Sequence, residues 1–138
     1  GCDRKNGPPG VAKYLLDSTV LIDYLRGRTG VVALVASLAE DGHELGVCAV
    51  NVAELYSRLE RRDSPRAEAL VHNLVYYSIS WADAKQAGRY RYEFAHQGKT
   101  LTVADTLIAA VAVAQGCTLV TANRKDYPMR EIKLLDQP

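Results

Sequence analysis

Several carboxylates in this sequence stand next to short apolar runs, at places where a strand should end or a helix should begin. Asp17 follows "KYLL", and Asp105 opens the apolar run "DTLIAAVAVA". Glu54 stands in the first turn of the helix expected after "GVCAV", while Asn123 and Asp126 follow "TLVT". An acid at such a place is either a helix cap or a ligand. The capping role needs no ligand, because the helix dipole alone favours an acid there by ~0.3–1 kcal/mol.

The joint placement of these acids indicates a metal site more strongly than any one of them does. Parallel strands end at the same edge of a sheet, where carboxylates that follow several strands would gather and repel one another. A divalent cation relieves that repulsion, and a site built from oxygen ligands suits Mg²⁺ or Mn²⁺ better than zinc. Such ions activate water and stabilise the leaving oxygen of a phosphodiester in in-line attack.

Apolar runs that alternate with helical patterns predict the elements that must position these acids. This alternation predicts an α/β domain with a mostly parallel sheet, in which ligands bind beyond the carboxyl ends of the strands. The strands are expected at 12–16, 43–50, 77–80, 117–122 and 130–136. The helices are expected at 18–27, 29–42, 51–62, 64–77, 81–98 and 102–116.

Short polar residues mark the expected helix starts. Asn51 is predicted to be the N-cap of the third helix, with Glu54 three residues later at the spacing of a capping box. Ser64 before Pro65 predicts the start of the fourth helix. For Glu54, a capping role and a ligand role remain two open interpretations at this point.

Length and composition predict one domain. The 138 residues are 48% hydrophobic, and 17 basic residues against 16 acidic ones leave a net charge of +1. Bulk positive charge therefore cannot attract nucleic acid, and any RNA contact needs a local patch. The three cysteines include no C-x-x-C pair, which predicts reduced thiols in a cytoplasmic protein. No apolar run reaches ~18 residues, so we expect no membrane contact. Residues 1–11 are expected to be a flexible tail and 12–138 the single domain.

Four segments resemble, in the same order, those of PIN-domain ribonucleases, and in particular the VapC-type toxins of bacterial and archaeal toxin–antitoxin pairs. The segments are "YLLDSTVLIDYLRG" at 14–27, "AVNVAEL" at 49–55, "LTVADTLIAAVAVAQG" at 101–116 and "LVTANRKDYP" at 119–128. The resemblance covers roughly residues 13–136. It implies a PIN-like three-layer α/β/α domain with a central, mostly parallel sheet.

The resemblance also implies roles for individual residues. Asp17, Glu54 and Asp105 match the family's first, second and third metal-binding acids. Asn123 and Asp126 share the fourth position, where the neutral Asn123 brings no charge and Asp126 either compensates or binds through water. The family's hydroxyls that hydrogen-bond the acids correspond to Ser18 and Thr121.

Two arginine-containing segments are candidates for RNA contacts. Arg58 and Arg62 lie in "RLERRDSPR", which either forms a solvated helix face or contacts RNA phosphates or an antitoxin segment. Arg89 and Arg91 alternate with aromatic residues in "GRYRYEF", a pattern that suits single-stranded RNA. Alternate residues of a helix point to different faces, so about half of this second segment is expected in the core.

The resulting expectation is the toxin of a toxin–antitoxin pair, a Mg²⁺- or Mn²⁺-dependent endoribonuclease that cleaves structured RNA such as tRNA or rRNA by metal-activated water. The resemblance also implies a cognate antitoxin and a homodimer. Two alternatives stay open within the family: a housekeeping RNA-processing nuclease, and a catalytically weak RNA-binding domain. A phosphorelay receiver is disfavoured, because the first strand ends in the single acid Asp17 and a late strand ends in Thr121 instead of lysine.

Overall fold

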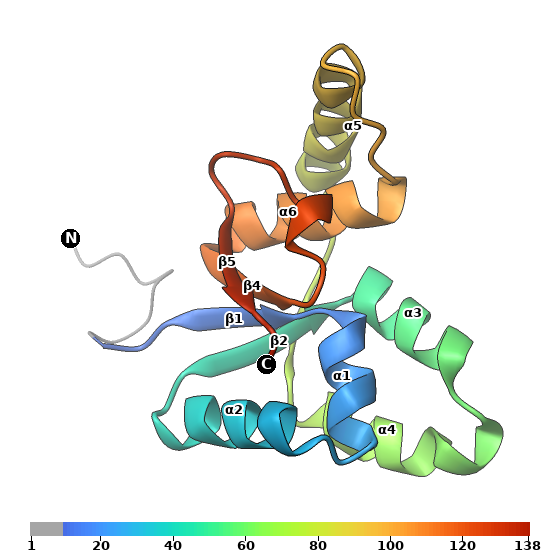
Figure 1. Cartoon of the computed structure of the whole chain (residues 1–138), viewed down its shortest axis with the longest axis vertical. Coiled ribbons are helices and arrows are strands. Elements are labelled where there is room, and N and C mark those ends of the chain that lie inside the picture. The colour runs from blue at the N-terminus through green and yellow to red at the C-terminus, as the bar shows by residue number, and fades with distance from the viewer. Residues whose placement is uncertain (1–9) are drawn as a thin grey trace.

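Five parallel strands form one sheet in the order β3-β2-β1-β4-β5 (Figure 1). The computed structural model describes residues 10–138, so Cys2 and most of the expected 1–11 tail lie outside the described residues. The strands are β1 (Lys13–Leu16), β2 (Glu44–Cys48), β3 (Val75–Tyr77), β4 (Cys117–Thr121) and β5 (Lys133–Asp136).

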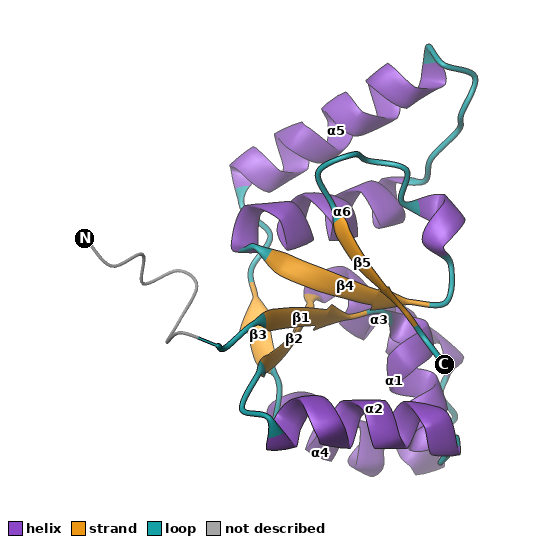
Figure 2. Ribbon diagram, turned by 60° about the vertical axis from the view of Figure 1, so that its left-hand side comes forward, coloured by secondary structure: helices purple, strands orange, loops and turns teal. Residues whose placement is uncertain are grey.

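Six α-helices cover the two faces of the sheet, and Figure 2 shows the resulting layers. The helices α1 to α4 lie on one face, while α6 lies on the other face with α5 on its outer side. The predicted three-layer α/β/α fold with a parallel sheet is therefore confirmed. The helices are α1 (Ser18–Leu25), α2 (Thr29–Glu40), α3 (Ala49–Arg58), α4 (Ser64–His72), α5 (Trp81–Ala95) and α6 (Val103–Gln115), with 3₁₀ turns η2 (Arg61–Asp63) and η3 (Arg124–Asp126).

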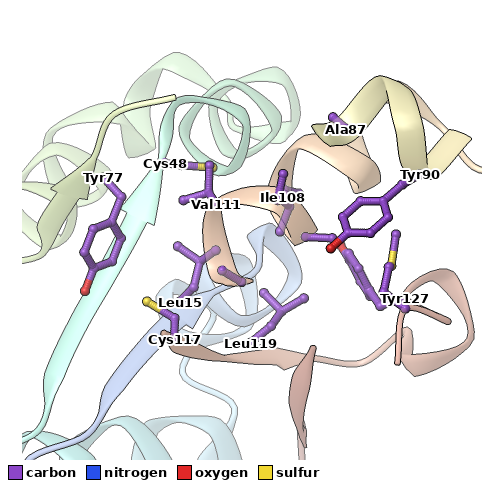
Figure 3. Packing of buried hydrophobic residues seen from close by; sticks show 14 of the residues in the cluster. Leu15, Cys48, Tyr77, Ala87, Tyr90, Ile108, Val111, Cys117, Leu119 and Tyr127 are labelled. Carbon is purple, nitrogen blue, oxygen red and sulfur yellow. The ribbon is translucent and has the colours of Figure 1, made fainter. Parts of the chain in front are cut away.

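Adjacent apolar residues in the central strands build two separate cores, because successive strand residues point to opposite faces of a sheet. In β1, Leu15 joins the cluster under α5 and α6, which Figure 3 shows, and Leu16 joins the cluster under α1 to α4. In β4, Leu119 joins the cluster under α5 and α6, and Val120 joins the cluster under α1 to α4. Burial on both faces explains why these strands are apolar runs without polar alternation.

The strand order places the topological switch point between β1 and β4. The chain builds the sheet from β1 through β2 to β3, and then returns to the other side of β1 with β4 and β5. The two central strands are in register, with Leu16 opposite Val120, and the Asp17 N–H donates to the Val120 carbonyl at 3.1 Å. Ligands of open parallel sheets bind at the carboxyl ends of the strands beside such a point.

The predicted N-cap at Asn51 is wrong. Helix α3 begins at Ala49, and Asn51 lies in its first turn, where its side-chain oxygen accepts a hydrogen bond from the Cys48 N–H at 2.9 Å. Glu54 consequently falls in the second turn, beyond the reach of a cap. Strand β2 ends two residues earlier than expected because the buried Asn51 side-chain oxygen accepts the hydrogen bond of the Cys48 N–H at the end of the strand.

Two boundaries around β3 also differ from the prediction. Helix α4 ends at His72 instead of residue 77, and β3 occupies Val75–Tyr77 instead of 77–80. The Tyr77 ring packs where a side chain on Gly46 of β2 would stand, which sets the position of β3 along the sheet. Ser64 is the first residue of α4, and its predicted capping side chain makes no cap contact.

Within residues 10–138, no helix combines the length and the apolar character that a bilayer crossing requires. The longest helix is α5, and its outer surface carries charged side chains.

Candidate active site

Asp17 lies at the junction of β1 and α1, beside the switch point of the sheet. Its Oδ1 accepts a hydrogen bond from the Ser18 N–H at 2.8 Å, so the carboxylate caps α1. Its Oδ2 accepts a second bond at 2.8 Å from the Thr121 hydroxyl, at the end of β4. Asp17 is only 5% exposed. The side chain is thus a helix cap and a buried carboxylate with both oxygens held by hydrogen bonds, and its role as a ligand stays a prediction.

Asp105 is brought to the same edge by the first turn of α6. The Thr102 hydroxyl caps this helix by accepting from the Asp105 N–H at 3.0 Å. The Asp105 carboxylate accepts a hydrogen bond at 3.3 Å from the hydroxyl of Tyr127, which follows η3 and is 3% exposed. The Thr102 cap therefore fixes the backbone at Asp105, and the Tyr127 hydroxyl orients the carboxylate.

Glu54 reaches the group from the second turn of α3. It is half-buried, and its pKa is raised by burial and then by the negative charges of Asp17 and Asp105. The Ser18 side chain and the Arg58 guanidinium lower the Glu54 pKa in part, as a hydrogen-bond donor and a cation. The charges of Asp17 and Asp105, which stand far from Glu54 in the sequence, thus act on its carboxylate.

The pKa values of the other two acids are raised as well. Burial is the main cause for Asp17, opposed by its bonds from Thr121 and Ser18, and the charge of Asp105 adds to the rise. Burial also raises the pKa of Asp105, and the neighbouring Asp126 adds to that effect. Each carboxylate is held where its charged form is disfavoured, which is the condition that a bound cation would relieve.

Tyr127 stands among the three acids. Its pKa is raised far above the ordinary value by burial and by the negative charges of Asp17, Asp105 and Glu54. The phenol therefore stays protonated and remains a hydrogen-bond donor to Asp105. In the sequence, Tyr127 is the aromatic residue that follows Asp126 in "LVTANRKDYP", and no local pattern distinguishes it from a core aromatic.

The donor set fits a hard, hydrated cation. Within the described part of the chain, no three His, Cys, Asp or Glu side chains are gathered closely enough to ligate one ion directly. Mg²⁺ keeps several waters and is commonly bound through one or two carboxylates, so carboxylates spaced in this way suit it. Asp17 and Asp105 are the best-oriented candidates, with Glu54 beside them.

The two candidates for the fourth position differ in their surroundings. Asp126 is half-buried in η3 and acts electrostatically on Asp105. The Asn123 side chain is exposed, while its backbone N–H donates to the Thr121 hydroxyl oxygen at 3.0 Å. The backbone of Asn123 therefore helps to orient Thr121, and Asp126 is the acid near the group.

Asn51 is a further polar residue that sequence reasoning did not place in this region. It is fully buried in the first turn of α3, and its side-chain nitrogen has no hydrogen-bond partner among the described residues. Its oxygen ties α3 to the end of β2. The "N-x-x-E" spacing, interpreted above as a capping box, was the available signal that this asparagine and Glu54 share one helix surface.

A basic cavity adjoins the acids. Arg58 lowers the pKa of both Asp17 and Glu54 through its charge and also lines this cavity of about 370 Å³. Arg62 also lines this cavity and pairs with Glu60 at 3.1 Å. The other basic residues of the lining are Arg26 and Arg66.

The second predicted pair of arginines lies elsewhere, on α5. Arg91 donates through Nε to the Leu101 carbonyl at 2.7 Å and so ties α5 to the segment that leads into α6. Arg89 is exposed on the outer side of α5. Neither arginine affects the pKa of the three acids.

Comparisons with known proteins agree on one family. A family model described as the PIN domain matches residues 14–133. Ribonuclease VapC19 of Mycobacterium tuberculosis is 30% identical over 117 residues, which cover 83% of this chain and 92% of that protein. VapBC2 from Rickettsia felis, solved with a promoter DNA fragment, aligns with a TM-score of 0.81 at 21% identity, over 91% of this chain and 99% of that one. A toxin–antitoxin complex from Klebsiella pneumoniae aligns with a TM-score of 0.73 at 20% identity, over 88% and 95%.

Proposed function

The chain belongs to the PIN-domain family and, within it, to the VapC-type proteins, and from that premise we propose that it is an endoribonuclease that acts as a toxin. Its substrate would be a structured RNA such as tRNA or rRNA. The observation that carries this proposal is the group of Asp17, Glu54 and Asp105, whose pKa values are all raised by burial. The charge of Asp105 adds to the rise for Asp17, and the charges of Asp17 and Asp105 add to it for Glu54.

We propose that this group holds Mg²⁺ or Mn²⁺ through Asp17 and Asp105, with Glu54 and Asp126 acting directly or through water. When bound there, the ion would lower the pKa of a coordinated water and stabilise charge on the phosphodiester. The expected products carry a 3′-hydroxyl and a 5′-phosphate.

The side chains of the protein would contribute orientation and charge. Thr121 and the Ser18 N–H hold both oxygens of Asp17, so that this carboxylate keeps one direction. Tyr127 does the same for Asp105, and its raised pKa keeps the donating proton in place. Arg58 lies between the acids and the basic cavity, where it would contact a phosphate of the bound RNA.

The basic cavity supports RNA as the substrate class. Of its arginines, Arg58 acts on both Asp17 and Glu54, so a phosphate backbone that crosses the cavity and reaches Arg58 would bring a phosphodiester towards the carboxylates. We further propose an antitoxin that silences the site, and a homodimer as the toxin's assembly. The antitoxin is supported by the toxin–antitoxin complex from Klebsiella pneumoniae, which this chain resembles in fold.

Replacing one acid tests the proposal. Asp105→Asn keeps the size of the side chain and an acceptor for Tyr127 but removes the charge, so we expect RNA cleavage to fall at least about a hundredfold. The purified protein would be incubated with total RNA in Mn²⁺ and in EDTA, and new 5′ ends would be mapped by sequencing.

The matched control is Asp41→Asn, the same change at an exposed acid at the end of α2. This control should cleave like the wild type. Full activity of Asp105→Asn, or cleavage that persists unchanged in EDTA, would contradict the proposed site. RNA binding without any cleavage by the wild type would instead favour the RNA-binding alternative.

A further inference from the structure

The outer face of α5 carries a row of aromatic, basic and glycine residues that the site described above does not use. We define the α5 stripe as Trp81, Lys85, Gly88, Arg89 and Tyr92. These positions recur at three- and four-residue spacing, so they share one side of the helix. The opposite side is the packing face, where Ala87 and Tyr90 are buried and point into the core in Figure 3.

The aromatic residues of the α5 stripe are far more exposed than packing would require. Trp81 is 78% exposed and Tyr92 is 68% exposed. Helix α5 lies on the outer side of α6 in both views (Figures 1 and 2), and neither ring belongs to either of the two hydrophobic cores. Exposed aromatic rings that share one face of a helix are typical of an interaction surface.

Neighbouring side chains support both rings. The Lys85 ammonium lies 5.4 Å from the centroid of the Trp81 ring. The Tyr92 ring lies 4.4 Å from that of His96, just beyond the end of α5. Each end of the stripe therefore presents an aromatic surface next to a polar or charged group.

Gly88 stands in the middle of the stripe, where the fold does not require a glycine. A Cβ at this position would meet nothing within 4 Å, and its backbone is helical. A glycine inside a helix costs roughly 0.5–1 kcal/mol relative to alanine. Its consequence is a shallow hollow of about 540 Å³, lined by Lys85, Gly88, Arg89, Tyr92 and Glu93.

We propose that the α5 stripe is a stacking subsite for a single-stranded stretch of the RNA substrate. Bases would stack on Trp81 and Tyr92, and one would rest over the bare backbone of Gly88, while Lys85 and Arg89 pair with phosphates. Stacking on aromatic rings with flanking cations is how proteins bind single strands without reading sequence. This inference rests on the proposed function, since it assigns a second contact to the same substrate.

The position of α5 in the chain connects the stripe to the acids. The segment 96–102 runs from the end of α5 directly into α6, which carries Asp105 in its first turn. The bond from Arg91 to the Leu101 carbonyl holds that segment against α5. A single strand that leaves the acids along this segment would meet Tyr92 first and Trp81 last.

RNA fits the stripe better than a protein partner does. Aromatic residues and arginine occur in both kinds of interface, but lysine is depleted from protein interfaces, and Lys85 stands beside Gly88 in this stripe. Glu93 is the one acid of the hollow, against two cations, so the lining has a net positive charge. A second copy of the chain would bring the same cations against themselves.

Trp81 is the only tryptophan of the chain, so its fluorescence reports on the proposed subsite directly. In EDTA, titration of the wild type with an oligouridylate of about ten nucleotides should quench this fluorescence and saturate. Duplex RNA of the same length should quench far less, because its bases are not free to stack. Asp105→Asn should be quenched like the wild type, which separates this inference from the proposed cleavage.

Two variants and one control sharpen the test. Tyr92→Ala should weaken oligouridylate binding about tenfold, and Gly88→Ala should weaken it while the helix becomes more stable. The control is Tyr76→Ala, which removes another exposed tyrosine, 56% exposed on β3, and should bind like the wild type.

Absence of quenching, or equal losses in Tyr92→Ala and Tyr76→Ala, would overturn the inference. So would a change of Trp81 fluorescence that follows protein concentration without RNA, because the stripe would then be an interface between copies. Sedimentation of the same samples distinguishes that case from RNA binding.

Discussion

Asp17 illustrates how single residues of the site combine structural and chemical roles. Its carboxylate caps α1, receives the Thr121 hydroxyl and still carries a raised pKa because it is buried next to Asp105. Two hydrogen bonds stabilise the charged form, but desolvation outweighs them. Burying such a carboxylate lowers the stability of the fold but keeps the group in one place. We therefore expect function to be sensitive to substitutions at its hydrogen-bond partners.

Thr121 offers the clearest prediction at this scale. Thr121→Val would remove the donor to Asp17 and the acceptor for the Asn123 N–H, with little change of shape. A buried acceptor left without a partner costs about 1–3 kcal/mol, so we expect the free energy of unfolding to fall by that amount and cleavage to fall with it. Urea unfolding and a cleavage assay measure the two effects.

Thr121→Ser is the matched variant, because it keeps the hydroxyl and loses only a methyl group. It should retain most of the activity of the wild type. Equal activity of the valine and serine variants would show that the Thr121 hydroxyl does not orient Asp17.

At the scale of elements, each acid lies near the start of a helix. Asp17 is the N-cap of α1, Asp105 lies in the first turn of α6, and Glu54 lies in the second turn of α3. Helix α1 follows β1, α3 follows β2, and α6 precedes β4, so their first turns all lie at the carboxyl edge of the sheet. Thr102 and the buried Asn51 determine where α6 and α3 begin. A shift of either helix by one residue would turn its acid about 100° away from the others.

The contact between β2 and β3 gives a prediction at this scale. In Gly46→Ala, the added Cβ would overlap the Tyr77 ring and approach the Val75 carbonyl oxygen to 2.9 Å. Because the backbone of a neighbouring strand cannot move easily, we expect a loss of about 1–3 kcal/mol of stability. Thermal unfolding followed by circular dichroism measures it.

The same substitution at Gly88 is the control, since a Cβ there meets nothing and α5 should gain roughly 0.5–1 kcal/mol. The two alanine variants should therefore shift the unfolding temperature in opposite directions. A stable Gly46→Ala protein would mean that β3 can move away from β2.

For the whole molecule, the raised pKa values of Asp17, Glu54 and Asp105 link stability to pH. A carboxyl whose pKa is higher in the folded state contributes stability that is complete below its unfolded pKa. That stability is lost as the pH rises through the folded pKa. The contribution of these three acids should therefore decrease from about pH 4 towards neutral pH, unless a cation binds them.

This linkage is measurable as a difference between proteins. In EDTA, Asp105→Asn should become more stable than the wild type as the pH rises to 7, by on the order of 0.5 kcal/mol after solvent screening of this half-buried group. Mn²⁺ should raise the unfolding temperature of the wild type and much less that of the variant.

Asp41→Asn serves again as the control, because this exposed acid is not one of the three carboxylates and should not change the response to Mn²⁺. A cation site at these carboxylates would be contradicted by two results together. The free energies of unfolding of the wild type and Asp105→Asn would change equally with pH, and Mn²⁺ would affect neither protein.

Much of the fold could be predicted from local patterns. The apolar runs predicted β1 and β4 nearly to the residue, and the Gly116 stop predicted the end of α6. The start of α3 could not be predicted, because Asn51 is an equally good cap by type and only its burial shows that it lies inside the helix. The end of α4 and the position of β3 depend on the Tyr77 ring over Gly46, a contact between strands that spacing does not reveal.

The sequence by itself determined which residue types could carry the chemistry and which elements they adjoin, because hydrophobic period and capping act over a few residues. Only the tertiary structure decided that Asp17, Glu54 and Asp105 share one edge, with Tyr127 among them and Arg58 beside them. That outcome depends on β1 and β4 pairing at the centre of the sheet. Strand order is chosen by the packing of two cores against both faces of the sheet, and such long-range burial leaves no trace in local spacing.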